Sequence, residues 1–162
     1  ILLGSVGGFL AYSLAKSGIG EEIPFDEGPP AWQRTELQNI SRAALDGTNR
    51  YRLSKGIEPL RWHQGLADIA EEHASSIVLG SGNFTHDGFD ERVAHYPFKY
   101  SAAAENLAMC RGRSDVAKCA VDGWIVSPTH ERNLVASFQL CGIGAAVDAD
   151  GRYFLTQLFA SV

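Results

Sequence analysis

Three side chains have the types that bind metals or transfer protons, and each lies at the edge of an expected helix or loop: His86, Glu105 and His130. Two imidazoles and one carboxylate suffice for a zinc site with three protein ligands and an open position that activates water. The same groups also form a stable polar network without metal, in which both histidines hydrogen-bond to Glu105 and to backbone groups. We prefer the polar network and keep a divalent metal, Zn²⁺, as the alternative cofactor.

Other common chemistries lack their motifs. The sequence has no phosphate-binding loop, no dinucleotide-binding Gly-x-Gly-x-x-Gly, no His-Glu-x-x-His and no Gly-x-Ser-x-Gly. A length of 162 residues, of which 45% are hydrophobic and 20% charged, predicts one folded domain and excludes a wholly disordered chain. The formal net charge of -5 argues against nucleic acid as a partner, because binding to the phosphate backbone needs an excess of Lys and Arg.

The cysteines leave the redox compartment open. Cys110 and Cys119 either form a disulfide or stay reduced, since Cys119 falls on the apolar face of an expected helix, where a buried thiol is equally natural. With Cys141 the count is odd, so at least one thiol is unpaired within the chain. If the chain enters a secretory compartment, the tripeptide Asn-Phe-Thr that begins at Asn83 is an acceptor for N-linked glycans.

Residues 1–16 are apolar up to the lysine that ends the segment. We expect an N-terminal helix here that anchors the chain in a membrane or docks on another protein, and the core of a signal peptide is the third interpretation. Gly4 and Gly8 would share one helix face, at the spacing that lets two membrane helices approach closely. Phe9 and Tyr12 belong to the same docking helix.

Residues 17–30 are rich in glycine, proline and acids, which predicts a linker to a globular domain over 31–162. Within that domain, apolar periodicity and breaking residues predict two helices, a long loop with a short helix, a further helix and a hairpin. These elements are expected at 32–55, 66–80, 81–104, 114–126 and around Asp150-Gly151. The run 153–160 is apolar on both faces, as in a strand that helices cover on each side, which predicts an α/β/α sandwich.

Three further residues of suggestive type are expected to be structural. His73 lies on the apolar stripe of a helix, which indicates a buried, hydrogen-bonded imidazole. Trp124 faces inward from its helix and is assigned to the core. Glu131 projects about 100° away from His130 on a helix, which makes it a poor additional ligand.

The order of several short motifs resembles the CAP superfamily, which includes the cysteine-rich secretory proteins, antigen 5 and the plant pathogenesis-related proteins. The motifs are Thr-Asn-Arg-Tyr-Arg at 48–52, Pro-Leu-Arg-Trp at 59–62, His-Ala at 73–74, His86, Glu-Asn-Leu-Ala at 105–108, Gly-Trp at 123–124, Ser-Pro-Thr-His-Glu-Arg-Asn at 127–133, Gly-Ile-Gly at 142–144 and the run 153–159. They are collinear over about residues 34–160, and the Ser-Pro-x-His form is most similar to bacterial-type and protist single-domain members. The resemblance implies the same α/β/α sandwich.

The resemblance also implies a cleft in which two histidines and two glutamates hold a divalent metal in some members. His86, Glu105 and His130 match three of these positions, whereas Ser127 stands where the second glutamate usually lies. The missing acid lowers metal affinity and removes a potential general base. Ser127 is instead expected to N-cap the helix that begins at Pro128.

Some members of this superfamily bind sterols or fatty acids, and some are reported to have protease activity. The segment 130–142 is too short and plain for the sterol-associated loop of eukaryotic members, so a lipid or sterol ligand is weakly supported. For proteolysis, neither a serine nor a cysteine nucleophile has a recognisable base partner.

Three functions remain open. We favour a non-catalytic CAP module that acts as a binding or accessory subunit and is tethered through residues 1–16 to a membrane or a larger assembly, with its domain in an extracytoplasmic or organellar-lumen compartment. The second is a secreted or soluble CAP protein that binds a metal or a lipid. The third is a metal-dependent hydrolase that uses His86, Glu105 and His130.

Overall fold

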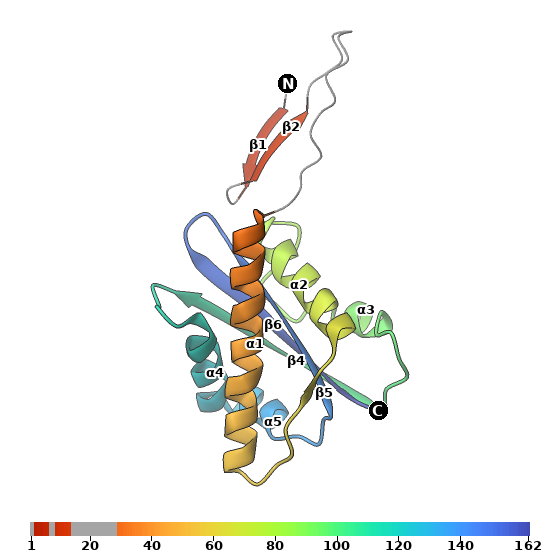
Figure 1. The fold of residues 1–162 in the computed structure, drawn as a ribbon. Coiled ribbons are helices and arrows are strands. Elements are labelled where there is room, and N and C mark those ends of the chain that lie inside the picture. The colour runs from red at the N-terminus through yellow and green to blue at the C-terminus, as the bar shows by residue number, and fades with distance from the viewer. Residues whose placement is uncertain (1, 7–8, 14–28) are drawn as a thin grey trace.

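The structure is a computed structural model, and it describes residues 2–6, 9–13 and 29–162 (Figure 1). The first two ranges are strands β1 (Leu2–Val6) and β2 (Phe9–Ser13), which pair antiparallel. Most of the expected linker, residues 17–28, lies outside the described residues.

The expectation of a helix over residues 1–16 is wrong. Gly4 lies opposite Ala11 in the strand pair, Tyr12 lies opposite Leu3, and Gly8 is outside the described residues. A helix here would contain several glycines, each of which costs about 1 kcal/mol relative to alanine. The sequence Gly-Gly between two apolar runs is instead typical of a hairpin. Among the described residues, no helix is long and apolar enough to cross a membrane.

The domain is built on a four-stranded sheet of order β3-β5-β6-β4. The strands are β3 (Arg61–Trp62), β4 (Ala102–Arg111), β5 (Leu140–Val147) and β6 (Arg152–Ser161). Strand β6 pairs antiparallel with both β5 and β4, and the short β3 pairs parallel with β5. The hairpin expected around Asp150-Gly151 is confirmed. Strand β4 is an edge strand, and it begins inside the segment 81–104 that the sequence pattern assigned to a loop.

Helices cover both faces of this sheet, as expected from the sequence (Figure 1). They are α1 (Ala31–Ser54), α2 (Gln64–Val78), α3 (Phe89–Ala94), α4 (Val116–Val126) and α5 (Pro128–Leu134). One apolar core joins α1, α4 and α5 to the sheet, with Trp124 at 1% exposure, and a second joins α2 and α3 to the other face. The α/β/α sandwich is therefore confirmed.

Two glycines bring α2 directly onto strand β5. A Cβ added at Gly142 would overlap the backbone nitrogen of Ala67, and one at Gly144 would overlap that of Glu71. Because these positions carry no side chain, the helix backbone rests on the strand backbone. Helix α2, which carries His73, therefore lies directly against the sheet.

Arg52 fastens the last turn of α1 to the segment that leads into β5. The residue is 1% exposed, and its guanidinium donates to four backbone carbonyls. The acceptors are Glu58 (2.8 Å), Leu134 (2.7 Å), Ala136 (2.8 Å) and Phe138 (3.2 Å). A buried arginine with only carbonyl partners is a structural clamp, since each of its bonds holds a loop in place.

The open question about the cysteines is answered by a disulfide. Cys110, at the end of β4, is bonded to Cys119 in α4. Cys141 is a free, buried thiol, and burial raises its pKa to about 12.

Candidate functional site

Glu105 is the centre of the polar residues that the sequence singled out. It lies in β4, its side chain is 1% exposed, and it faces α2 and α3. Arg92 of α3 donates to both carboxylate oxygens, from Nε to Oε2 (2.7 Å) and from Nη2 to Oε1 (2.8 Å). His86, in the loop before α3, places Nδ1 2.9 Å from Oε1. A buried carboxylate is stable only when it is paired and hydrogen-bonded in this way.

Arg92 is the functional residue that sequence reasoning missed. Besides Glu105, it donates from Nη1 to the carbonyl of Asp87 (2.9 Å), so it also fixes the loop that carries His86. One signal was present in the sequence, because a carboxylate buried in a strand needs a cation. The cations between His86 and Glu105 are Arg92 and Lys99.

His73 approaches the same carboxylate from α2. As expected it is buried and hydrogen-bonded, with Nδ1 3.1 Å from Oγ1 of Thr156. The same Nδ1 lies 3.8 Å from Oε2 of Glu105, so His73 borders the cluster as well as the core. Burial lowers the pKa of His73, and the nearby positive charge of Arg92 lowers it further. The imidazole therefore stays neutral around pH 7.

His130 lies on the other side of β4, in α5. Its Nδ1 is 2.9 Å from Oγ of Ser127, and burial and His86 lower its pKa. Ser127 does stand at the N-cap position with Pro128 at the first helical position, but its side chain makes no capping hydrogen bond. The expected cap is thus wrong, because the Ser127 hydroxyl turns to the imidazole. The hydroxyl oxygen of Thr129 lies 3.1 Å from that of Ser127.

Helix α5 is held against the exposed edge of β4 by amide side chains. Asn133 donates to the backbone carbonyl of Glu105 (3.3 Å) and to Oδ1 of Asn106 (2.9 Å). Asn106 in turn donates to the carbonyl of His130 (3.3 Å). Edge strands leave backbone groups unpaired, and Asn133 satisfies one of them, the carbonyl of Glu105. Together the three bonds hold α5, and with it His130, beside β4.

The two histidines come together, with ring centroids 6.5 Å apart. We call His86, Arg92, Glu105, Ser127 and His130 the histidine cluster. Glu131 lies elsewhere, as expected, since it accepts a hydrogen bond from Tyr51 (2.9 Å).

The histidine cluster does not fit a divalent metal as it stands. Both oxygens of Glu105 already accept hydrogen bonds from a guanidinium, whose positive charge opposes a second cation. Ser127 replaces the second acid, and its hydroxyl is engaged by His130. In the part of the chain that the structure describes, no three His, Cys, Asp or Glu side chains gather as metal ligands. The zinc alternative therefore gains no support from this arrangement.

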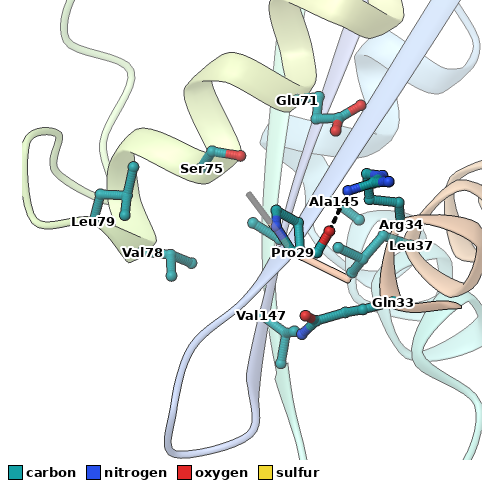
Figure 2. Close-up of a pocket in the computed structure, with 11 residues that line it drawn as sticks. Pro29, Gln33, Arg34, Leu37, Glu71, Ser75, Val78, Leu79, Ala145 and Val147 are labelled. Atoms are coloured by element: carbon teal, nitrogen blue, oxygen red, sulfur yellow. Dashed lines mark hydrogen bonds between the residues drawn. The ribbon is translucent and has the colours of Figure 1, made fainter. Parts of the chain in front are cut away.

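A separate hollow lies between the start of α1 and the end of α2, above β5 (Figure 2). Gln33 and Leu37 of α1 line one side, and Glu71 and Ser75 of α2 line the other. Its volume of about 180 Å³ is below the roughly 300 Å³ at which pockets for drug-sized ligands begin. The lipid alternative gains no support from this hollow.

The chain is thus a three-layer α/β/α domain in which two histidines meet at the edge of the sheet. The model of the CAP family, described as the cysteine-rich secretory protein family, matches residues 45–159. The chain belongs to this family.

Similar proteins agree with this assignment. Pathogenesis-related proteins 1B and 1C of tobacco (Nicotiana tabacum) are each 31% identical, over 67% and 65% of this chain and 58% and 56% of their own lengths. An extracellular protein with an SCP domain from Bacillus anthracis superimposes with a TM-score of 0.67 at 25% identity, over 84% of this chain and 45% of that one. An outer surface protein from Borrelia burgdorferi shares the fold, with a TM-score of 0.64 and 20% identity over 78% of this chain and 92% of that one. The chain thus spans a little over half the length of the tobacco relatives.

Proposed function

We propose that the chain is a non-catalytic CAP domain that serves as a binding or accessory module. The observation that carries the proposal is the pairing of Arg92 with both oxygens of Glu105. A general base needs a free carboxylate oxygen, and a metal ligand needs a lone pair that is not opposed by a fixed positive charge. Glu105 offers neither, so its pairing with Arg92 serves to hold α3 and the His86 loop on the sheet.

The test gives the histidine cluster the free carboxylate and the second acid that it lacks. In R92M/S127E, Glu105 is freed and a second acid returns beside the histidines, so we expect Zn²⁺ affinity to rise by about tenfold or more over the wild type. The double variant R92M/S127Q is the matched control, since it has the same bulk without the added charge. Competition with a chromophoric chelator measures the affinity of the tag-free chain.

The same proteins then serve in hydrolysis assays with peptide and ester substrates. We expect wild type and H86A to show the same background rate. A wild-type chain that binds Zn²⁺ as tightly as R92M/S127E, or a rate that falls in H86A, contradicts the proposal.

We further propose that the apolar strands β1 and β2 dock the module on a larger protein assembly. The support is their sequence, Leu-Leu-Gly-Ser-Val and Phe-Leu-Ala-Tyr-Ser, together with strand pairing that leaves outer backbone edges for strand addition. Removal of residues 1–28 is expected to leave a folded domain that no longer co-migrates with the assembly in native gels after mild extraction. Full-length chain that migrates alone near 17.5 kDa would count against docking.

An oxidising, extracytoplasmic compartment is proposed for the domain. The disulfide between Cys110 and Cys119 supports it, because such bonds persist mainly outside reducing compartments. Alkylation of the endogenous protein before and after reduction measures the state of the two thiols. Two reactive thiols at these positions in freshly quenched material would contradict the proposal.

A further inference from the structure

The loop between α2 and α3 displays a glycan acceptor that the histidine cluster does not use. Asn83, Phe84 and Thr85 are all exposed, and the backbone there is a bend rather than a helix or strand. Phe84 packs its ring against Phe154 at 5.7 Å, which fixes the loop on the end of β6. We propose that Asn83 carries an N-linked glycan, an inference that rests on the oxidising, extracytoplasmic compartment proposed above.

The chain contains a second tripeptide of the same type, and its setting differs. Asn39, Ile40 and Ser41 lie within α1, where Ser41 is 4% exposed and donates to the carbonyl of Leu37 (3.0 Å). Residues two apart on a helix do not face the same side, so one enzyme site cannot contact both the amide and the hydroxyl. At the loop position the exposed hydroxyl of Thr85 contacts only Asp87, another exposed residue. The geometry therefore selects Asn83 over Asn39.

The co-reactant is a polyprenyl-diphosphate-linked oligosaccharide, from which a glycosyltransferase transfers the sugar. The side-chain amide nitrogen of Asn83 forms a bond to C1 of the first sugar and gives up one proton. The bond from C1 to the diphosphate oxygen breaks, and its electron pair leaves with the polyprenyl diphosphate. No oxidation or reduction takes place.

A glycan at Asn83 would affect binding of partners near His86. Asn83 precedes His86 by three residues, so their Cα atoms are at most about 11 Å apart. A bulky, hydrated group at that distance limits approach to the exposed side of His86. Partners of the domain would then contact faces away from this loop.

The experiment uses the full chain purified from its own source and the same chain secreted from eukaryotic cells. We expect one downward gel shift on treatment with peptide N-glycosidase and conversion of Asn83 to aspartate in the released peptide. The shift is expected to be absent in N83Q and T85A and present in T85S, which keeps the hydroxyl, and in N39Q. A shift that survives in N83Q, or no shift in the wild type, overturns the inference.

A second readout separates this inference from the compartment on which it rests. Alkylation without reductant reports whether Cys110 and Cys119 are bonded in the same samples. Protein that has the disulfide but no glycan overturns the glycan and leaves the compartment proposal standing. Protein that has neither overturns both.

Discussion

The histidine cluster has two halves that satisfy their polar groups in different ways. In the carboxylate half, the side chain of Glu105 is 1% exposed and takes a guanidinium on both oxygens. In the hydroxyl half, His130 is partly exposed and needs only the Oγ of Ser127 at 2.9 Å. The difference follows from burial, because a buried charge requires a counter-charge whereas a partly exposed neutral ring also has water.

This difference predicts that Glu105 and Ser127 tolerate substitution to different degrees. A serine can stand in the hydroxyl half because no charge there is left unpaired. In the carboxylate half, replacing Glu105 by a neutral residue leaves the charge of Arg92 unpaired. The two halves should therefore respond very differently to substitution, and the following experiments test that difference.

The largest effect is expected from neutralising Glu105. E105Q leaves Arg92 without its counter-charge, and losing one partner of a buried ion pair costs about 3–5 kcal/mol. Urea unfolding followed by tryptophan fluorescence measures the loss. Removing both charges in E105Q/R92M should recover part of the lost free energy of unfolding. If E105Q were as stable as the wild type, the two halves would not differ in their need for a counter-charge.

The disulfide physically connects the halves, since it joins β4, which carries Glu105, to α4, which ends at Val126, directly before Ser127. For this short loop, C110S/C119S should lower the free energy of unfolding by about 2.5 kcal/mol. Cys141 provides an internal check in the folded variant: burial raises the pKa of its thiol to about 12, so iodoacetamide should leave it unlabelled. Labelling of Cys141 in the native chain would mean that the core has opened.

A pH titration probes one histidine from each side of β4. Burial lowers the pKa of His73 and of His130 in the folded state, whereas in the unfolded chain each returns to about 6.5. Below pH 6.5 the unfolded state therefore binds more protons, so the free energy of unfolding should fall as the pH decreases from 7.5 to 5.5. H73Q and H130Q should each flatten the slope. A slope that neither substitution changes would assign the pH dependence to other groups.

The smallest effect is expected in the hydroxyl half. S127A removes one hydrogen bond to a partly exposed ring, which costs about 1 kcal/mol or less. T129A is the matched control and should cost less still, because Thr129 contacts the hydroxyl rather than the imidazole. The chemical shifts of the His130 ring protons should move in S127A and stay in place in T129A.

Much of the fold was predictable because local sequence patterns determine it. Apolar stripes and breaking residues located α1, α2 and α4, and Asp150-Gly151 marked the hairpin. Strand β4 was missed, since its first residues are alanines, which have little preference for strands. The N-terminal expectation failed because an apolar composition alone does not separate a helix from a hairpin.

The residues of the candidate site were also predictable only in part. His86, Glu105 and His130 could be named from short motifs, and the structure brings them together around β4. Arg92 was missed because the sequence offers both Arg92 and Lys99 as cations for Glu105, and the choice between them depends on where α3 packs. The hydroxyl of Ser127 was assigned to the helix backbone, and only the position of the His130 ring shows that it turns inward.

The Arg52 clamp has a consequence for how the chain is made. Its carbonyl acceptors at Leu134, Ala136 and Phe138 lie 82 to 86 residues further along the chain. At roughly 5–20 residues per second, a ribosome needs on the order of ten seconds to add them. During that interval Arg52 has only the nearby carbonyl of Glu58 as an acceptor, so its clamp is completed only when the last third of the chain has emerged.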